Sequence, residues 1–170
     1  MSIQDHLAEL IKAGRLRPFL PRFGGRVVRR LLLTEELHRE LTEPGAYPLE
    51  YGIGFLTADL ERFVVGGRQT FGMGSNNHCT IKVLDDWSDE IWEIRSRREK
   101  PGVRVFGRFV LPDVFVATAV VDRKELGNDF DVEKRRCGAA WRQLFYSYEP
   151  YRGANPDDYI TSNLIDLRVQ

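Results

Sequence analysis

The chain has 170 residues, of which 42% are hydrophobic and 29% charged, and its 25 basic side chains balance 25 acidic ones. This composition is typical of a single globular domain, and the zero net charge argues against a strongly basic nucleic-acid-binding protein. The longest apolar run, 114–121, is far shorter than the roughly 20 residues that span a bilayer, so we expect no membrane segment.

The N-terminal part predicts two helices joined by an arm. Ser2 is a suitable N-cap for a first helix, which we expect to end at Gly14. A second helix begins at Thr34, whose hydroxyl can accept from the first backbone amides. Prolines and glycines in 15–25 indicate a loop or extended arm, and the apolar run of 26–33 fits a strand and a helix equally well.

Period-two alternation dominates the middle of the chain. Tyr51, Ile53 and Phe55 alternate around glycines and predict a short strand, and 57–63 predicts a helical turn. Five further strands are predicted at 69–73, 79–84, 90–95, 103–111 and 115–121. Because turn residues separate these strands, we expect a mainly antiparallel meander of four or five strands over about residues 69–121.

A C-terminal helix is predicted over about residues 129–147, with an apolar face that packs on the sheet. No repeat or linker divides the chain, so the prediction is one α+β domain over 1–170. In this fold the N-terminal helices and the C-terminal helix cover a four- to five-stranded, mainly antiparallel sheet.

The cysteines predict neither a disulfide framework nor a metal site. Cys79 and Cys137 are far apart in sequence, and each lacks a second cysteine at close spacing. The three histidines are also scattered, so a zinc site would need distant residues. We therefore expect a reducing, cytoplasmic location, with no metal and no cofactor.

Basic residues are segregated along the chain despite the neutral total. From Leu10 to Thr34 there are seven cations and no acid. An acid-free stretch of this kind is a solvated arm, a dimer contact or a surface that binds another protein. On the last interpretation, the partner-binding candidates are Arg15, Arg17, Arg22 and Arg26.

The segment 92–126 carries the most informative pattern. It contains Trp-Glu-Ile-Arg from Trp92, then Val-Arg-Val-Phe from Val103, and then an apolar strand that ends in Asp-Arg-Lys. If these strands are neighbours, they bring together Arg95, Arg104, Arg108, Arg123 and Lys124. Clustered cations are what a phosphate backbone requires, so we predict that the first three of these arginines share one exposed concave face. The alternative is that they pair with Glu90, Glu93 and Asp113 on the solvent side.

This pattern resembles the strand core of RelE/HigB-type toxins, in which a curved antiparallel sheet presents basic residues for cleaving messenger RNA at the ribosome. The family pattern is Glu-Leu-Arg, then Tyr-Arg-hydrophobic-Phe, then a strand leading to Lys-Lys. The resemblance implies a toxin–antitoxin protein with Arg95, Arg104 and Lys124 in catalytic roles. It also puts Arg123 and Lys124 near the family's basic pair. The nucleic-acid-binding candidates of this sequence are Arg97, Arg98, Arg108 and Arg123.

The expected function is therefore interaction with RNA or DNA, extending to metal-independent endoribonuclease activity if chemistry occurs. Arginine can stabilise a cleaved phosphate but exchanges protons poorly, because its pKa stays above about 12. An acid and a base would come from a tyrosine or from Glu93, Glu99, His78 or Lys124. The alternative is a non-enzymatic accessory protein that binds another protein through the basic arm and an aromatic surface. The sequence leaves the oligomeric state open.

Overall fold

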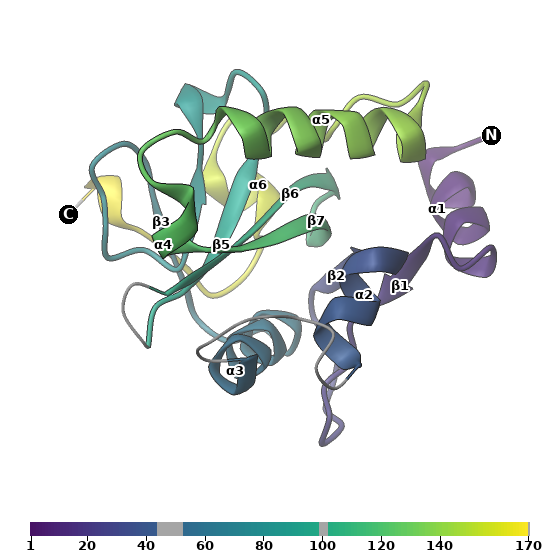
Figure 1. Cartoon of the computed structure of the whole chain (residues 1–170), viewed down its shortest axis with the longest axis horizontal. Helices are drawn as coiled ribbons and strands as arrows, with labels where there is room; N and C mark the ends of the chain where they lie inside the picture. Colours follow the sequence, from purple (N-terminus) through teal and green to yellow (C-terminus); the bar gives the residue numbers. More distant parts are fainter. Residues whose placement is uncertain (44–52, 99–101, 170) are drawn as a thin grey trace.

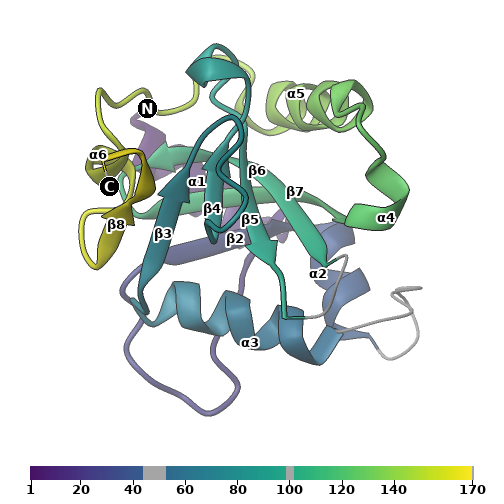
Figure 2. The same ribbon diagram turned by 90° about the vertical axis from the view of Figure 1, so that its left-hand side faces the viewer.

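Eight strands form one mixed sheet with helices on both faces (Figures 1 and 2). The computed structural model describes residues 1–43, 53–98 and 102–169. The strand order is β1-β2-β7-β6-β5-β4-β3-β8. The strands are β1 (Leu16–Pro18), β2 (Arg30–Thr34), β3 (Gln69–Gly72), β4 (Ile81–Val83), β5 (Trp92–Ser96), β6 (Val103–Leu111), β7 (Val114–Asp122) and β8 (Leu164–Asp166). The α-helices are α1 (Ile3–Lys12), α2 (Glu35–Thr42), α3 (Ile53–Val64), α4 (Arg123–Leu126), α5 (Asp131–Phe145) and α6 (Pro156–Tyr159), and short 3-10 helices lie at Asp85–Trp87 and Leu167–Val169.

The sheet has more strands than predicted, and it contains parallel as well as antiparallel pairs. Antiparallel pairing holds from β4 to β7, but β2 runs parallel to β7, and β3 runs parallel to both β4 and β8. A four- to five-stranded, mainly antiparallel sheet is therefore wrong. The additional strands β1, β2 and β8 are only three to five residues long. β2 and β8 join the sheet through strands distant in sequence, and β1 is added to its edge by pairing with β2.

The start of α3 overturns another local prediction. Ile53 and Phe55 belong to the first turn of this helix, so the predicted short strand is wrong, and Tyr51 lies outside the described residues. By contrast, Ser2 and Asp5 form a reciprocal capping box at α1, and Thr34 accepts from the Leu37 amide at the start of α2. Both helix starts were predicted correctly because N-caps depend on local hydrogen bonds.

Two sets of helices sandwich the sheet. On one face, Leu37 of α2 and Leu56, Leu60 and Phe63 of α3 join the main core. On the other face, α1 and α5 share a second cluster, and Leu126 of α4 joins a third with residues of α5 and β6. Alternation along β5 thus turns Trp92 and Ile94 toward α3, and turns Glu93 and Arg95 toward the α4 and α5 side.

Trp92 is the centre of the main core. Its ring centroid lies 4.6 Å from that of Tyr159, 5.2 Å from Phe109 and 5.5 Å from Phe71. These tilted and edge-on contacts join β3, β5, β6 and α6, so β5 is fixed tightly on this face. The charged side chains on the opposite face of the strand therefore have a rigid support.

A bulge in the β6–β7 hairpin depends on Gly107. A Cβ at this position would collide with the Val116 carbonyl oxygen and would lie 2.7 Å from the Phe115 ring.

We expect Gly107→Ala to lower the free energy of unfolding by about 1–3 kcal/mol, as overpacking does. Urea denaturation checks this, with Gly54→Ala as the control. Gly54 lies in α3 with open space around it, so its replacement should be neutral or stabilising by up to about 1 kcal/mol.

Candidate nucleic-acid interface

Cations gather around one buried carboxylate on the α4 and α5 side of the sheet. Glu93 faces Lys82 directly across the β4–β5 pair, and Arg95 faces Arg104 across the β5–β6 pair. Arg95 Nε lies 3.3 Å and Arg104 Nε 3.8 Å from the two Glu93 carboxylate oxygens. We call the following residues the Glu93 cluster: Lys82, Glu93, Arg95, Arg97, Arg104 and Arg123.

The centre of the Glu93 cluster is almost closed to solvent. Glu93, Arg95 and Arg104 are 3%, 8% and 4% exposed. Backbone carbonyls help to hold the guanidinium groups, because Arg95 Nη1 donates to Asn77 O at 3.1 Å and Arg104 Nη1 donates to Val103 O at 3.2 Å. Arg95 Nε and Glu93 Oε2 are nevertheless buried without a hydrogen-bond partner among the described residues. These two atoms therefore contribute to the site through charge and not through hydrogen bonds with the described residues.

Positive charge exceeds negative charge within the Glu93 cluster. Burial lowers the pKa of Arg104 to about 10, and repulsion from Arg95, Arg123 and Arg97 adds to this effect although Glu93 opposes it. Burial raises the pKa of Glu93, and the neighbouring cations oppose that shift. Arg104 still carries its charge at neutral pH, so the cluster remains strongly cationic there. A further anion would relieve this repulsion.

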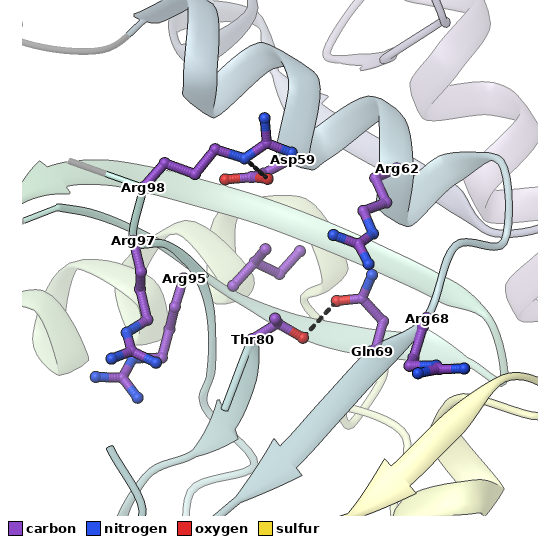
Figure 3. A pocket seen from close by; sticks show the side chains of 9 residues that line it. Asp59, Arg62, Arg68, Gln69, Thr80, Arg95, Arg97 and Arg98 are labelled. Atoms are coloured by element: carbon purple, nitrogen blue, oxygen red, sulfur yellow. Dashed lines mark hydrogen bonds and ion pairs between the residues drawn. The ribbon is translucent and has the colours of Figure 1, made fainter. Parts of the chain in front are cut away.

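A pocket of about 350 Å³ opens beside the Glu93 cluster, where α3 passes the end of β5 (Figure 3). Its described lining consists of Asp59, Arg62, Arg68, Gln69, Thr80, Ile94, Arg95, Arg97 and Arg98. In Figure 3, Arg62 points toward Gln69 and Thr80, whereas Arg95 and Arg97 extend together away from Arg62. Successive residues at the end of β5 thus supply arginines both to this pocket and to the Glu93 cluster.

The structure brings together four of the seven predicted catalytic and nucleic-acid-binding residues: Arg95, Arg97, Arg104 and Arg123. The predicted exposure of Arg95 and Arg104 is wrong, since both are buried. Arg97 and Arg123 are partly exposed, so they are the accessible arginines of the cluster. The alternative pairing with carboxylates is realised only at Glu93, which Arg95 and Arg104 share.

The other three predicted residues lie elsewhere. Arg108 donates from Nε and Nη2 to Asp89 O at 3.1 and 2.9 Å, and its guanidinium lies 5.7 Å from the Trp141 ring centroid. Arg108 thus lies on the α5 side of the sheet, as Arg95 and Arg104 do, but the predicted open patch of these three arginines is wrong, because the Arg108 guanidinium is held by Asp89 O and Trp141. Arg98 pairs with Asp59 on the α3 side, and Lys124 is exposed on α4 next to Arg123.

The cations of the basic arm do not form one patch. Arg15 donates to Gln143 O at 2.9 Å, and Arg17 lies 3.9 Å from Glu35. Arg22 forms an ion pair of 2.9 Å with Glu61 of α3, and Arg26 is exposed. Arg29, from the same stretch, is fully buried and donates to backbone carbonyls.

Sequence reasoning missed Lys82, Arg62 and Arg68. Lys82 could have been found from strand alternation and pairing, because it lies opposite Glu93. Arg62 and Arg68 flank the two glycines after α3, and no local pattern indicates that this turn meets the end of β5. Their place in the site follows from the tertiary packing of α3.

The described part of the chain contains no group of three or more His, Cys, Asp or Glu residues placed to hold a metal ion. None of the helices in it has the length and apolar character needed to cross a membrane. Comparison with family models, curated proteins and solved structures finds no match to this chain.

Glu93 should be essential for stability, because it is the carboxylate that Arg95 and Arg104 share. We expect Glu93→Gln to lower the free energy of unfolding by about 3–5 kcal/mol, since it leaves buried guanidinium groups uncompensated. Urea denaturation measures this change. The matched control is Glu125→Gln on the exposed surface of α4, which should change stability by less than about 0.5 kcal/mol. Equal stability of the two variants would contradict the assigned role of Glu93.

Proposed function

We propose that the protein binds single-stranded nucleic acid through the Glu93 cluster. The observation that supports this proposal is the excess of buried and half-buried cations over the shared carboxylate of Glu93. Arginine suits phosphate because its planar fork donates two parallel hydrogen bonds. A cytoplasmic location belongs to the same proposal, and the two buried free thiols, Cys79 and Cys137, are compatible with it.

The members of the cluster would contribute differently to binding. Arg97 and Arg123 are half-buried and would contact phosphate oxygens directly. For Arg123, the phosphate would compete with the Gly127 carbonyl oxygen, which accepts from Nη1, and with the Phe130 ring, whose centroid lies 5.6 Å from the guanidinium. Arg95 and Arg104 would act mainly through their charge, which is screened less by salt because both are buried. Together they would concentrate positive potential at the end of β5, where a polyanion can approach.

RNA cleavage extends this proposal toward a toxin-like endoribonuclease. Arg95 and Arg104 would stabilise the charge that develops on the phosphate, while other groups move the protons. His78 and Lys124 are exposed candidates, and His78 follows Asn77, whose carbonyl accepts from Arg95. Metal-independent cleavage would appear as shortened RNA in the presence of EDTA, and it should be lost when His78 or Lys124 is replaced by Ala.

Replacing Arg97 and Arg123 by Ala should weaken binding of a fluorescent single-stranded RNA at least tenfold at low salt. Two lost phosphate contacts should also reduce the slope of log K against log salt concentration by about 1.4. Fluorescence anisotropy at several salt concentrations measures both effects. Arg142→Ala, on the exposed face of α5 near its C-terminal end, is the control and should leave the slope unchanged.

Absence of RNA and DNA binding by the unmodified protein at low salt would reject this function. Binding that the Arg97 and Arg123 substitutions leave intact would reject the Glu93 cluster as its site. Unfolding of the double variant, monitored by circular dichroism, would require the same test with each substitution alone.

A second candidate function is binding of another protein through the arm at 19–29. This arm exposes Phe23 by 93% and Leu20 by 64%, and Val27 and Val28 are also exposed. Arg22, which is paired with Glu61, and the exposed Arg26 flank these apolar side chains. An acidic protein with an apolar patch would complement such a surface.

Substitution tests this candidate better than deletion, because β1 and β2 border the arm and belong to the sheet. We expect Leu20→Ser combined with Phe23→Ser to abolish specific co-purification from the native host without a loss of thermal stability. The control is Tyr146→Ser, which changes an equally exposed aromatic residue just after α5. An unchanged set of co-purified proteins would count against the arm.

A further inference from the structure

The pocket between α3 and the end of β5 contains cations that the Glu93 cluster does not use. Arg62 extends from the last turn of α3, and Arg68 precedes β3. Both side chains are exposed, and neither has an ion pair within 4.0 Å among the described residues. These two arginines are therefore free to bind an external anion.

The carboxylate in the described lining of the pocket is already occupied. Asp59 accepts from Ser96 Oγ at 2.7 Å and forms an ion pair of 3.4 Å with Arg98. Asp59 therefore balances Arg98 and leaves the charges of Arg62 and Arg68 unopposed. The described lining contains five arginines and one carboxylate, and such an excess of positive charge attracts anions.

The turn after α3 fixes the base of Arg62. The Gly67 amide donates to the Arg62 carbonyl at 2.7 Å, and a Cβ on Gly67 would collide with Arg62 Cγ. The stem of Arg62 thus packs closely on this turn. The turn therefore fixes the start of the Arg62 side chain, while its guanidinium is exposed to an external anion.

The floor of the pocket is polar and ordered. Thr80 Oγ1 donates to Gln69 Oε1 at 2.9 Å, and Gln69 Nε2 donates to Gly67 O at 3.3 Å. A second buried donor lies at the boundary with the Glu93 cluster. Arg95 is 7% exposed at its side chain and lines the pocket, and its Nε forms an ion pair of 3.3 Å with Glu93 but no hydrogen bond with any described residue.

We propose that this pocket is a phosphate-binding subsite. The inference rests on the proposed function, because the phosphate would belong to the same nucleic-acid strand that contacts the Glu93 cluster. A strand that crosses the end of β5 would meet Arg97 on one side and Arg62 and Arg68 on the other. Phe55 is 39% exposed on α3, with Arg98 6.0 Å from its ring centroid, and it offers a face on which an adjoining base can stack.

The test is the double charge reversal Arg62→Glu and Arg68→Glu, compared with Arg142→Glu. Binding of a fluorescent eight-nucleotide RNA is measured by anisotropy at several salt concentrations, and binding of AMP and of inorganic phosphate is measured by calorimetry. We expect the double variant to bind the RNA at least tenfold more weakly. Its slope of log K against log salt should fall by about 1.4, as for two lost phosphate contacts on a single strand.

The outcomes separate this inference from the proposed function. If the RNA binds the double variant and the unmodified protein alike, the subsite on the strand is overturned, whereas an effect of the Arg97 and Arg123 substitutions would still support the Glu93 cluster. If AMP or phosphate binding is lost while RNA binding is unchanged, the pocket serves a free phosphorylated ligand and the strand assignment is overturned. If only Phe55→Ala weakens the RNA, stacking without phosphate contact replaces the proposal.

Discussion

The arrangement of the candidate interface depends on one buried carboxylate. Arg95 and Arg104 are directly opposed on neighbouring strands, and like charges in that position repel each other. Glu93 lies between them, at 3.3 and 3.8 Å from their Nε atoms, and offsets part of this repulsion. Burying such a group costs several kcal/mol per ion, and apolar residues of similar size would often be no less stable. The presence of these buried charges is therefore not explained by the stability of the sheet alone.

The aromatic core on the other face makes this arrangement rigid. Trp92 and Ile94 anchor β5 against α3, and alternation then turns Glu93 and Arg95 to the α4 and α5 side. The third core cluster, with Phe106 and Cys137, covers the same side next to Glu93, so water is excluded around the carboxylate. Packing on both faces of the sheet thus fixes the positions of the Arg95 and Arg104 guanidinium groups. The exclusion of water also strengthens their electrostatic field.

Local signals in the sequence predicted more than distant ones. The capping box at Ser2 and the alternation in β5, β6 and β7 depend on near neighbours, and these elements were located correctly. The sequence left a strand as one of two possibilities for the segments that contain β2 and β8, and it predicted no strand at β1. Three to five residues carry too little periodicity to decide between these possibilities or to reveal a partner strand. Arg95 and Arg104 were placed on the correct strands. Their exposure was predicted wrongly, because polar residues point to solvent only where one face of a sheet is open, and here helices cover both faces. Arg29 illustrates the same limit, since its burial among backbone carbonyls depends on residues of α3 and the C-terminal segment.

Zero net charge is compatible with a strong local electrostatic field, because the acidic side chains neutralise some arginines and not others. Glu61 balances Arg22, Asp59 balances Arg98, and Glu133 balances Arg136, each within a local pair. Three cations without an ion pair among the described residues lie on the two sides of the end of β5, namely Arg97 with the Glu93 cluster and Arg62 and Arg68 in the pocket. Salt screens paired and unpaired surface charges alike beyond about one Debye length, roughly 8 Å at physiological salt, so the field at the end of β5 is set mainly by the charges near it. Binding at this edge should therefore be far more sensitive to salt than the neutral composition suggests, because the relevant charge is local.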